Sequence, residues 1–406
     1  MTIDWVAGRG GRLALAGGSV EFACHGPAPA DAPTLVLLHE GLGSVGLWRD
    51  VPAALAEATG WGVFSYSRLG HGRSDPAVLP RPLDHMTREA VNVLPRLLDA
   101  IGLRRGVLLG HSDGATIAAE HGGRVCDPRV EALVLIAPHF FTEAGGLDAI
   151  RAAKVAYEAG DLRTRLARHH DDPDNAFHGW SGVWLDPDFR DWNVAEVLDA
   201  ITIPALAIQG RDDEYGTLAQ IDTITARANG PVETLIFDGC RHAPHLERPD
   251  AVTDAVKVLC ARLDEGHAAG IDWPDHMHIP GRNARHAEGA FDAIRADAVT
   301  GLSPAALAQT TAFRHGLAFL DAGYFWEAHE VLEPVWLALP DDAPARRFVQ
   351  GLIQLANARL KARMGRPKAA DRLFVMARAL MGADATALTR DDVVERYRLE
   401  ARVPEL

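Results

Sequence analysis

One stretch, Val107–Ala115, constrains this chain more than any other. Its apolar start is followed by the pattern Gly-x-Ser-x-Gly over Gly110–Gly114 and then by small residues that suit a helix. This order predicts a buried strand, a sharp turn that carries one serine, and a helix. Glycines on both sides of Ser112 permit a strained backbone, so the serine hydroxyl would stand exposed at the turn. The amide of Asp113 would then lie at a helix N-terminus, where it could stabilise an oxyanion.

Continuous apolar runs recur through the first two thirds of the chain. A strand that is covered on both faces has such a sequence, because neither face meets water. Helical patterns separate the runs, so we expect an α/β fold with a doubly wound, mostly parallel sheet. Alternating residues before the first run predict an antiparallel hairpin that turns at Gly17 and Gly18. Besides the strand before Ser112, the expected strands cover residues 34–38, 63–66, 132–137, 205–208 and 233–237.

The regular alternation of strands and helices is interrupted before the strand at 205–208. The segment 139–200 is rich in histidine and tryptophan and is too long for a simple crossover, so it predicts a helical cap. Trp180 and Trp184 would either line an apolar pocket or pack the cap onto the body. Helical patterns alone follow residue 300, which predicts a small all-helical bundle. The expected division is an α/β domain over 1–265, a linker or arm over 266–300 and a helical domain over 301–406.

Composition excludes several classes of partner. The 406 residues carry a formal net charge of −14, which argues against nucleic acid and anionic membranes as partners. The four cysteines form no Cys-x-x-Cys pair, so neither a disulfide framework nor a zinc site is indicated. The N-terminus lacks the features of a signal peptide, and no apolar run is long enough to span a bilayer. We therefore expect a cytoplasmic protein that needs no cofactor.

Three polar residue types follow three of the expected strands. A serine hydroxyl needs a base, and that base needs a partner that fixes its tautomer. Asp213 is the better acid in the loop after the strand 205–208, although Asp212 remains possible. His242 is favoured over His245 after the last strand, again by its offset from the preceding glycine. Because ligands bind at the carboxyl ends of parallel strands, Ser112, Asp213 and His242 are predicted to form a catalytic triad.

A second oxyanion donor is expected after the strand 34–38. The backbone amide of Gly41 is the first choice, with Leu42 next, and it would act together with the amide of Asp113. The residues predicted to line the substrate pocket are Glu40, Leu42, His111, Trp180 and Trp184.

The residues up to about 265 resemble α/β-hydrolases of the esterase and C–C-hydrolase type. The resemblance rests on the segments 39–44, 68–74, 110–114, 210–213 and 239–247. Glu40 departs from the family, which has glycine after this histidine, and Asp113 stands where Met or Gln is more common. Glu40 would either place a carboxylate beside the oxyanion loop or point outward. A carboxylate that faces the pocket would disfavour anionic substrates and tolerate cationic or neutral ones.

The expected function is that of a serine hydrolase. A serine nucleophile disfavours the chemistry of haloalkane dehalogenases and dienelactone hydrolases, which the resemblance associates with Asp and Cys. We expect cleavage of a small carboxylic ester or thioester through a seryl acyl-enzyme. Two alternatives remain: hydrolysis of a C–C bond in a β-diketone-like substrate, and ligand binding without catalysis on the same fold.

The helical tail has a motif of its own, over residues 323–336. It contains His329, Glu330 and Glu333, and the glutamines Gln350 and Gln354 recur on the next expected helix. This motif resembles family 309 of the domains of unknown function, over roughly residues 275–379, and the resemblance implies no activity. His329, Glu330 and Glu333 are weak candidates for metal ligands, because the second histidine of a His-Glu-x-x-His site is missing. A buried polar cluster is the alternative. The tail could also support a homo-oligomer.

Overall fold

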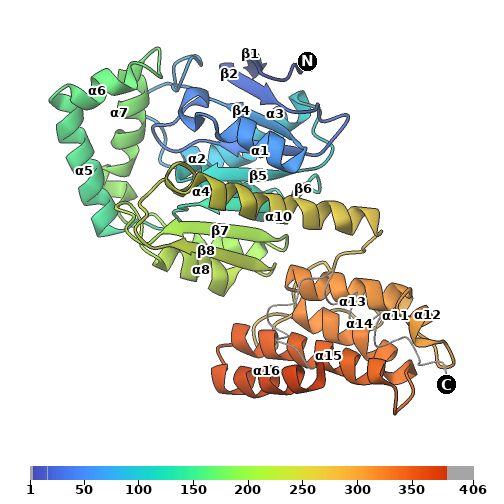
Figure 1. The fold of residues 1–406 in the computed structure, drawn as a ribbon. Coiled ribbons are helices and arrows are strands. Elements are labelled where there is room, and N and C mark those ends of the chain that lie inside the picture. The colour runs from blue at the N-terminus through green and yellow to red at the C-terminus, as the bar shows by residue number, and fades with distance from the viewer. Residues whose placement is uncertain (1–2, 16, 382–406) are drawn as a thin grey trace. The chain divides into compact units, whose positions relative to one another are not determined.

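The computed structural model describes residues 3–15 and 17–381, and the chain divides into two compact units. The first unit comprises the residues up to Ala228 together with Val232–Leu263. The second comprises Asn229–Pro231 and the residues from Asp264 onwards. Figure 1 shows the α/β character of the first unit and the all-helical character of the second, which confirms the predicted fold class.

The first unit is built on an eight-stranded sheet with the order β1-β2-β4-β3-β5-β6-β7-β8. The strands β1 and β2 form the expected hairpin, and β2 pairs antiparallel with β4. Every later pairing is parallel. The strands are β1 (Arg9–Leu15), β2 (Gly18–His25), β3 (Thr34–Leu38), β4 (Gly62–Tyr66), β5 (Gly106–His111), β6 (Val130–Ile136), β7 (Ala205–Gly210) and β8 (Val232–Phe237).

Helices cover both faces of the sheet, which is why its central strands are apolar throughout. In β5, Leu108 packs in one core cluster, while Val107 and Leu109 pack in the cluster on the opposite face. Successive strand residues point to opposite faces, so a strand buried on both sides shows no alternation. The first face holds α2 (His85–Arg88), α3 (Leu94–Ala100), α4 (Asp113–Arg124) and α8 (Ala219–Arg227), and the second α1 (Val51–Thr59) and α10 (Pro249–Ala268).

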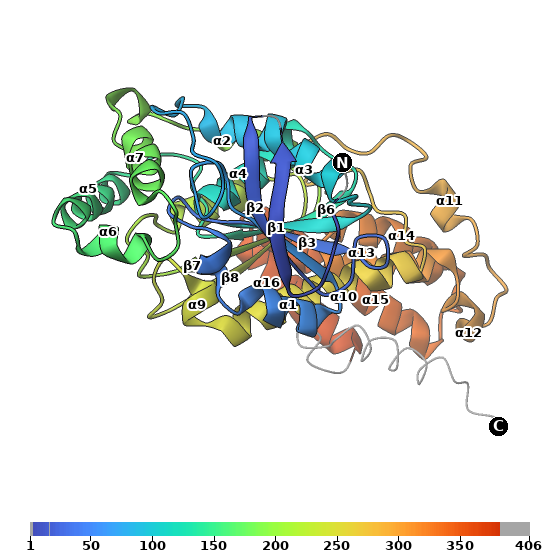
Figure 2. The same cartoon turned by 90° about the horizontal axis from the view of Figure 1, so that it is seen from above.

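A helical cap lies between β6 and β7, as predicted. It contains α5 (Ala144–Glu158), α6 (Asp161–Leu166) and α7 (Pro173–Trp184). The rings of Tyr157 and Phe177 stack with centroids 3.8 Å apart and join α5 to α7. Both views show the three helices together beyond one end of the strands (Figures 1 and 2). The short helix α9 (Pro244–Glu247) follows β8.

The second unit consists of helices and an irregular segment that packs with them. The helices are α11 (Asp292–Arg295), α12 (Pro304–Leu307), α13 (Thr311–Ala322), α14 (Phe325–Ala338), α15 (Pro344–Arg363) and α16 (Pro367–Met381). The segment predicted to be a linker places Met277, Ile279 and Phe291 in the core of this unit. It is therefore part of the helical unit rather than a connection to it. Its apolar residues are spaced irregularly among prolines and histidines, so they have no helical or strand period.

None of the described helices is both long enough and apolar enough to cross a bilayer.

Candidate active site

Ser112 occupies a strained turn between β5 and α4. Its backbone has φ 54° and ψ −119°, a region that non-glycine residues rarely adopt. The flanking glycines allow this turn, because a Cβ on Gly110 would lie 2.2 Å from the carbonyl oxygen of Gly114. A Cβ on Gly114 would lie 1.9 Å from the carbonyl oxygen of Leu38 in β3. The turn therefore depends on close packing of helix against sheet at residues without side chains.

This packing makes a stability prediction for Gly114→Ala. The added methyl group meets the backbone of β3, which cannot move without disturbing the sheet, so the unfolding free energy of the α/β unit should fall by about 1–3 kcal/mol. Urea unfolding followed by circular dichroism measures the change. Gly145→Ala is the matched control, because nothing lies within 4 Å of its added Cβ in α5. Equal losses in the two variants would contradict this account of the turn.

Asp213 and His242 meet at the carboxyl ends of β7 and β8. The Nδ1 atom of His242 lies 2.9 Å and 2.8 Å from the two carboxylate oxygens of Asp213. The Asp213 side chain is fully buried and also accepts hydrogen bonds from the Tyr215 amide and the Gln209 side chain. Burial opposes its ionisation, but the hydrogen bond and charge of His242 lower the pKa of Asp213 below its usual value. A carboxylate in this position holds the proton of His242 on Nδ1, which leaves Nε2 free as a base.

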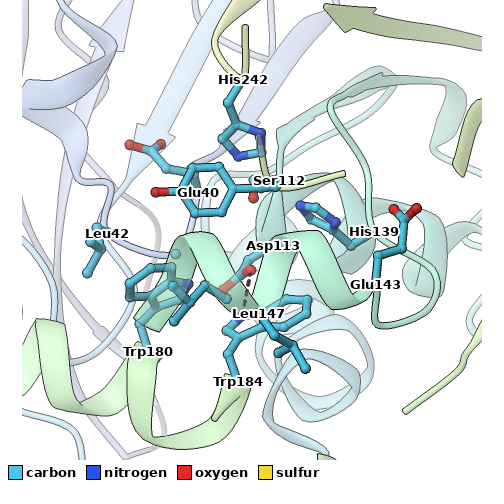
Figure 3. Close-up of a pocket in the computed structure, with 14 residues that line it drawn as sticks. Glu40, Leu42, Ser112, Asp113, His139, Glu143, Leu147, Trp180, Trp184 and His242 are labelled. Atoms are coloured by element: carbon cyan, nitrogen blue, oxygen red, sulfur yellow. Dashed lines mark hydrogen bonds between the residues drawn. The ribbon is translucent and has the colours of Figure 1, made fainter. Parts of the chain in front are cut away.

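Ser112 and His242 line one cavity of about 120 Å³ together with Gly41 and Asp113. Figure 3 shows the imidazole of His242 and Ser112 at the same end of this cavity, with Trp180 and Trp184 on the opposite side. The volume is close to that of the ~150 Å³ cavity that binds one benzene molecule. The lining residues are Glu40, Gly41, Leu42, Ser112, Asp113, His139, Glu143, Gly146, Leu147, Ile150, Trp180, Trp184, Tyr215 and His242.

The alternatives for the acid and the base lie elsewhere. Asp212 is exposed, and its amide donates to the carbonyl of Cys240. His245 is buried against His111, with ring centroids 4.5 Å apart. His111 was predicted as a pocket residue, but it is not among the residues that line the cavity. Its Nε2 instead donates to the carbonyl of His242 at 2.8 Å, so it supports the loop that carries that histidine.

The backbone amides of Gly41 and Asp113 have no hydrogen-bond acceptor in the described part of the chain. Gly41 is fixed from both sides. Its carbonyl accepts a hydrogen bond from His71 at 2.9 Å, and a Cβ at this position would lie 2.1 Å from the indole of Trp180. Gly41 and Asp113 line the same cavity as Ser112, and an amide without an acceptor at such a place is able to donate to an oxyanion.

The two residues that depart from the family pattern both line the cavity. The Oε2 atom of Glu40 lies 3.4 Å from Nδ1 of His111. Burial opposes ionisation of Glu40, but contact with His111 and the nearby His245 lower its pKa to about 2. Asp113 accepts a hydrogen bond from the Trp184 indole at 3.2 Å, and burial raises the pKa of Asp113. Of the two orientations considered for Glu40, the structure shows the one beside the oxyanion loop.

The comparison with known families decides the class of protein. The alpha/beta hydrolase family model matches residues 35–255, which is more than half of the chain. This chain belongs to the alpha/beta hydrolase family. A second match, to the Domain of unknown function (DUF309), covers residues 313–373 of the helical unit.

Relatives of this alpha/beta hydrolase carry hydrolase names. It is 28% identical over 216 residues to a putative carbamate hydrolase RutD of Pseudomonas syringae pv. syringae, which covers 47% of this chain and 79% of that protein. It is 31% identical over 116 residues to the human (lyso)-N-acylphosphatidylethanolamine lipase, covering 28% of this chain and 33% of the lipase. The chain thus spans about a third of the lipase's length.

Solved structures share the fold of this hydrolase. Proline iminopeptidase of Mycobacterium smegmatis is 20% identical, with a TM-score of 0.53, over 64% of this chain and 100% of that chain. A carboxylesterase structure from the thaumarchaeon Nitrososphaera gargenis is also 20% identical, with a TM-score of 0.50, over 63% and 99%. At this level of identity the likeness establishes the fold.

The sequence-based prediction of the hydrolase pocket missed one side of it. Glu143 and the α5 residues Gly146, Leu147 and Ile150 line the cavity, and so does His139 after β6. Burial lowers the pKa of His139 to about 3, so this imidazole is neutral near pH 7. The pocket residues predicted in the cap were the tryptophans of α7. The lining residues of α5 are small or aliphatic, and such residues do not indicate a function in a sequence. His139 and Tyr215 lie in the loops that follow β6 and β7, and this position past a strand end was the usable signal.

The metal candidates of the helical unit do not converge. His329 contacts the side chain of Asn357 at 3.0 Å, Glu330 pairs with Arg295, and Glu333 is exposed. Within residues 3–15 and 17–381, no group of three or more His, Cys, Asp or Glu side chains is placed to hold a metal ion.

The buried polar group of the helical unit is centred on Glu327 instead. This carboxylate accepts hydrogen bonds from the amide of His278 at 2.6 Å and from Nε2 of His286 at 2.8 Å. It therefore ties α14 to the irregular segment before α11. On α15, the helix that carries Gln350 and Gln354, the side chain that contacts His329 is that of Asn357.

Proposed function

We propose that this protein is a serine hydrolase in which Ser112 is the nucleophile. His242 takes the proton from the Ser112 hydroxyl as the oxygen attacks a carbonyl carbon, and Asp213 stabilises the imidazolium that forms. The amides of Gly41 and Asp113 donate to the resulting oxyanion. The observation that carries the proposal is the contact of His242 with buried Asp213 on the wall of the cavity that also holds the strained Ser112.

The reaction would then proceed through an acyl-enzyme. Collapse of the tetrahedral intermediate expels the leaving group, which takes the proton from His242, and leaves the acyl group bound to Ser112. Water attacks this ester after giving a proton to His242, and the second intermediate releases the carboxylic acid and the free serine. His242 accepts and returns the proton in both halves of the reaction.

A small carboxylic ester or thioester is the proposed substrate class. The cavity of about 120 Å³ is close in volume to one that encloses a benzene ring, which suits a small acyl group. Leu42, Leu147 and Ile150 make part of its wall apolar. The hydrolase names of the relatives, a carbamate hydrolase and a lipase, support carbonyl cleavage by water as the reaction type.

Pre-steady-state kinetics test the acyl-enzyme. With 4-nitrophenyl acetate and 4-nitrophenyl hexanoate, we expect a burst of 4-nitrophenol that equals the enzyme concentration, followed by slower turnover. The acetyl ester should have the higher kcat/KM because its acyl group fits the small cavity. Rapid cleavage of a β-diketone with no ester turnover would instead identify a C–C hydrolase, and inactivity toward both classes would favour a binding protein.

A further inference from the structure

The candidate cavity combines acidic side chains with aromatic rings. Glu40, Asp113 and Glu143 line it from three separate segments, namely the loop after β3, the first residue of α4 and the start of the cap. Among the described residues that line it, none is lysine or arginine. A concave site with one sign of charge attracts ligands of the opposite sign.

Asp113 has an oxygen without a partner. The residue is only 3% exposed, its Oδ1 accepts a hydrogen bond from the Trp184 indole, and no donor in the described part of the chain reaches its Oδ2. Oδ2 faces Gly41 and would lie 3.1 Å from a Cβ at that position. A carboxylate oxygen without a donor from the protein can pair with a ligand that supplies positive charge.

The other two carboxylates are those of Glu143 and Glu40. Glu143 accepts hydrogen bonds from the amide and hydroxyl of Thr217 and from Gln220, all of them neutral groups. Glu40 also lines the cavity; its side chain is 28% exposed, and its Oε2 lies 3.4 Å from Nδ1 of His111. None of these partners is a lysine or an arginine.

The nearest arginines are occupied behind the oxyanion loop. Arg68 donates to the carbonyls of His39 and Glu40, and Arg81 donates to the carbonyl of Leu69. Neither arginine lines the cavity. Their guanidinium groups stabilise the loop and do not offer a binding site for an anion.

Aromatic rings complete the site. Trp180, Trp184 and Tyr215 line the cavity, and the rings of Trp180 and Tyr215 lie 6.5 Å apart at an interplanar angle of 67°. Figure 3 shows both indoles beside the carboxylate of Asp113. Ring faces next to carboxylates are the combination by which proteins bind alkylammonium groups.

We propose that the substrate carries an alkylammonium group close to the scissile acyl bond. Its positive charge would lie between the rings of Trp180 and Tyr215 and the carboxylates of Glu40 and Asp113. This inference rests on the proposed function and names the substrate class of the same site.

Matched pairs of esters test the inference, because each pair differs only in charge. Acetylcholine and 3,3-dimethylbutyl acetate differ on the alcohol side. The 4-nitrophenyl esters of 4-(trimethylammonio)butanoate and 5,5-dimethylhexanoate differ on the acyl side. We expect the cationic member of at least one pair to have a kcat/KM about tenfold higher or more. Equal or better cleavage of the neutral member in both pairs would overturn the inference.

Charge-removing variants then test the assigned carboxylates. Glu40→Gln and Asp113→Asn should each lower the ratio of cationic to neutral kcat/KM by about fivefold, because each removes one negative charge beside the ammonium group. Glu158→Gln on the exposed end of α5 is the control with the same charge change, and its ratio should equal that of the wild type. A ratio unchanged in both pocket variants would overturn the assignment.

A binding measurement separates this inference from the proposed function. Ser112→Ala protein is titrated calorimetrically with choline and with 3,3-dimethylbutan-1-ol, and choline should bind about tenfold more tightly. If choline binds selectively but no ester is cleaved, the cavity binds alkylammonium groups as inferred, but the proposed function fails and with it the assignment of a substrate. If esters are cleaved without preference and choline binds no better than the neutral alcohol, the function stands and the inference fails.

Discussion

Ser112→Ala should lower kcat/KM for 4-nitrophenyl acetate by about 10⁵- to 10⁶-fold, because it removes the oxygen that attacks the carbonyl carbon. What remains should be the weak catalysis that the oxyanion amides and binding provide. Steady-state rates at high enzyme concentration measure the loss, and complete removal of the burst should accompany it. The variant should unfold at the wild-type urea concentration, since alanine fits the same turn.

Retention of more than about 1% of the activity in folded Ser112→Ala protein would contradict the assignment. It would mean that another side chain, or a bound water molecule, acts as the nucleophile. The cavity offers His139 and Tyr215 as the next candidates by position.

Asp213→Asn should lower kcat by about 10⁴-fold, because an amide cannot stabilise the imidazolium of His242 and can hold the wrong tautomer. Asp212→Asn is the matched control. Asp212 is the adjacent residue in the chain, undergoes the same chemical change, is exposed and contacts the main chain of Cys240 through its amide alone. Its kcat should stay within about twofold of the wild type, as is usual for an exposed substitution.

The opposite pattern, with a large loss in Asp212→Asn and a small one in Asp213→Asn, would assign the acid to the other aspartate. Equal small losses would mean that His242 works without a carboxylate partner. Circular dichroism of both variants separates these outcomes from unfolding, because Asp213 also holds the amide of Tyr215.

The parallel sheet could be predicted from the sequence because its central strands are buried on both faces. Every residue of β3 and β5 is buried, so both strands are continuous apolar runs. The edge strand β1 is largely exposed, and alternation with a glycine turn was the signal there. The order of the strands in the sheet could not be predicted from any one apolar run, since it depends on how the helices pack onto the two faces of the sheet.

The order of Ser112, Asp213 and His242 could also be predicted, because each follows a strand and parallel strands end at one edge. The choice of Asp213 over Asp212 depended on its offset from the glycine, and the structure places Asp213 against His242. The contact forms between the loop after β7 and the loop after β8, and no local sequence pattern predicts how two such loops meet.

The cap side of the pocket could not be predicted in the same way. Which residues of α5 and α7 face the cavity depends on how the cap helices pack over the sheet, and both helices have apolar residues on more than one face. The close approach of Trp180 to Gly41 is a tertiary contact of this kind. The burial of the irregular segment before α11, which the sequence predicted as a linker or arm, could not be predicted either, because buried residues in loops follow no period.

The central claim is that Ser112 is an activated nucleophile, and covalent labelling tests it most directly. The protein is treated with a fluorophosphonate, digested, and sequenced by tandem mass spectrometry. We predict one adduct per molecule, on the peptide that contains Ser112, and no adduct in heat-denatured protein or in Ser112→Ala. Absence of labelling in the folded protein, or an adduct on a different residue, would contradict the account.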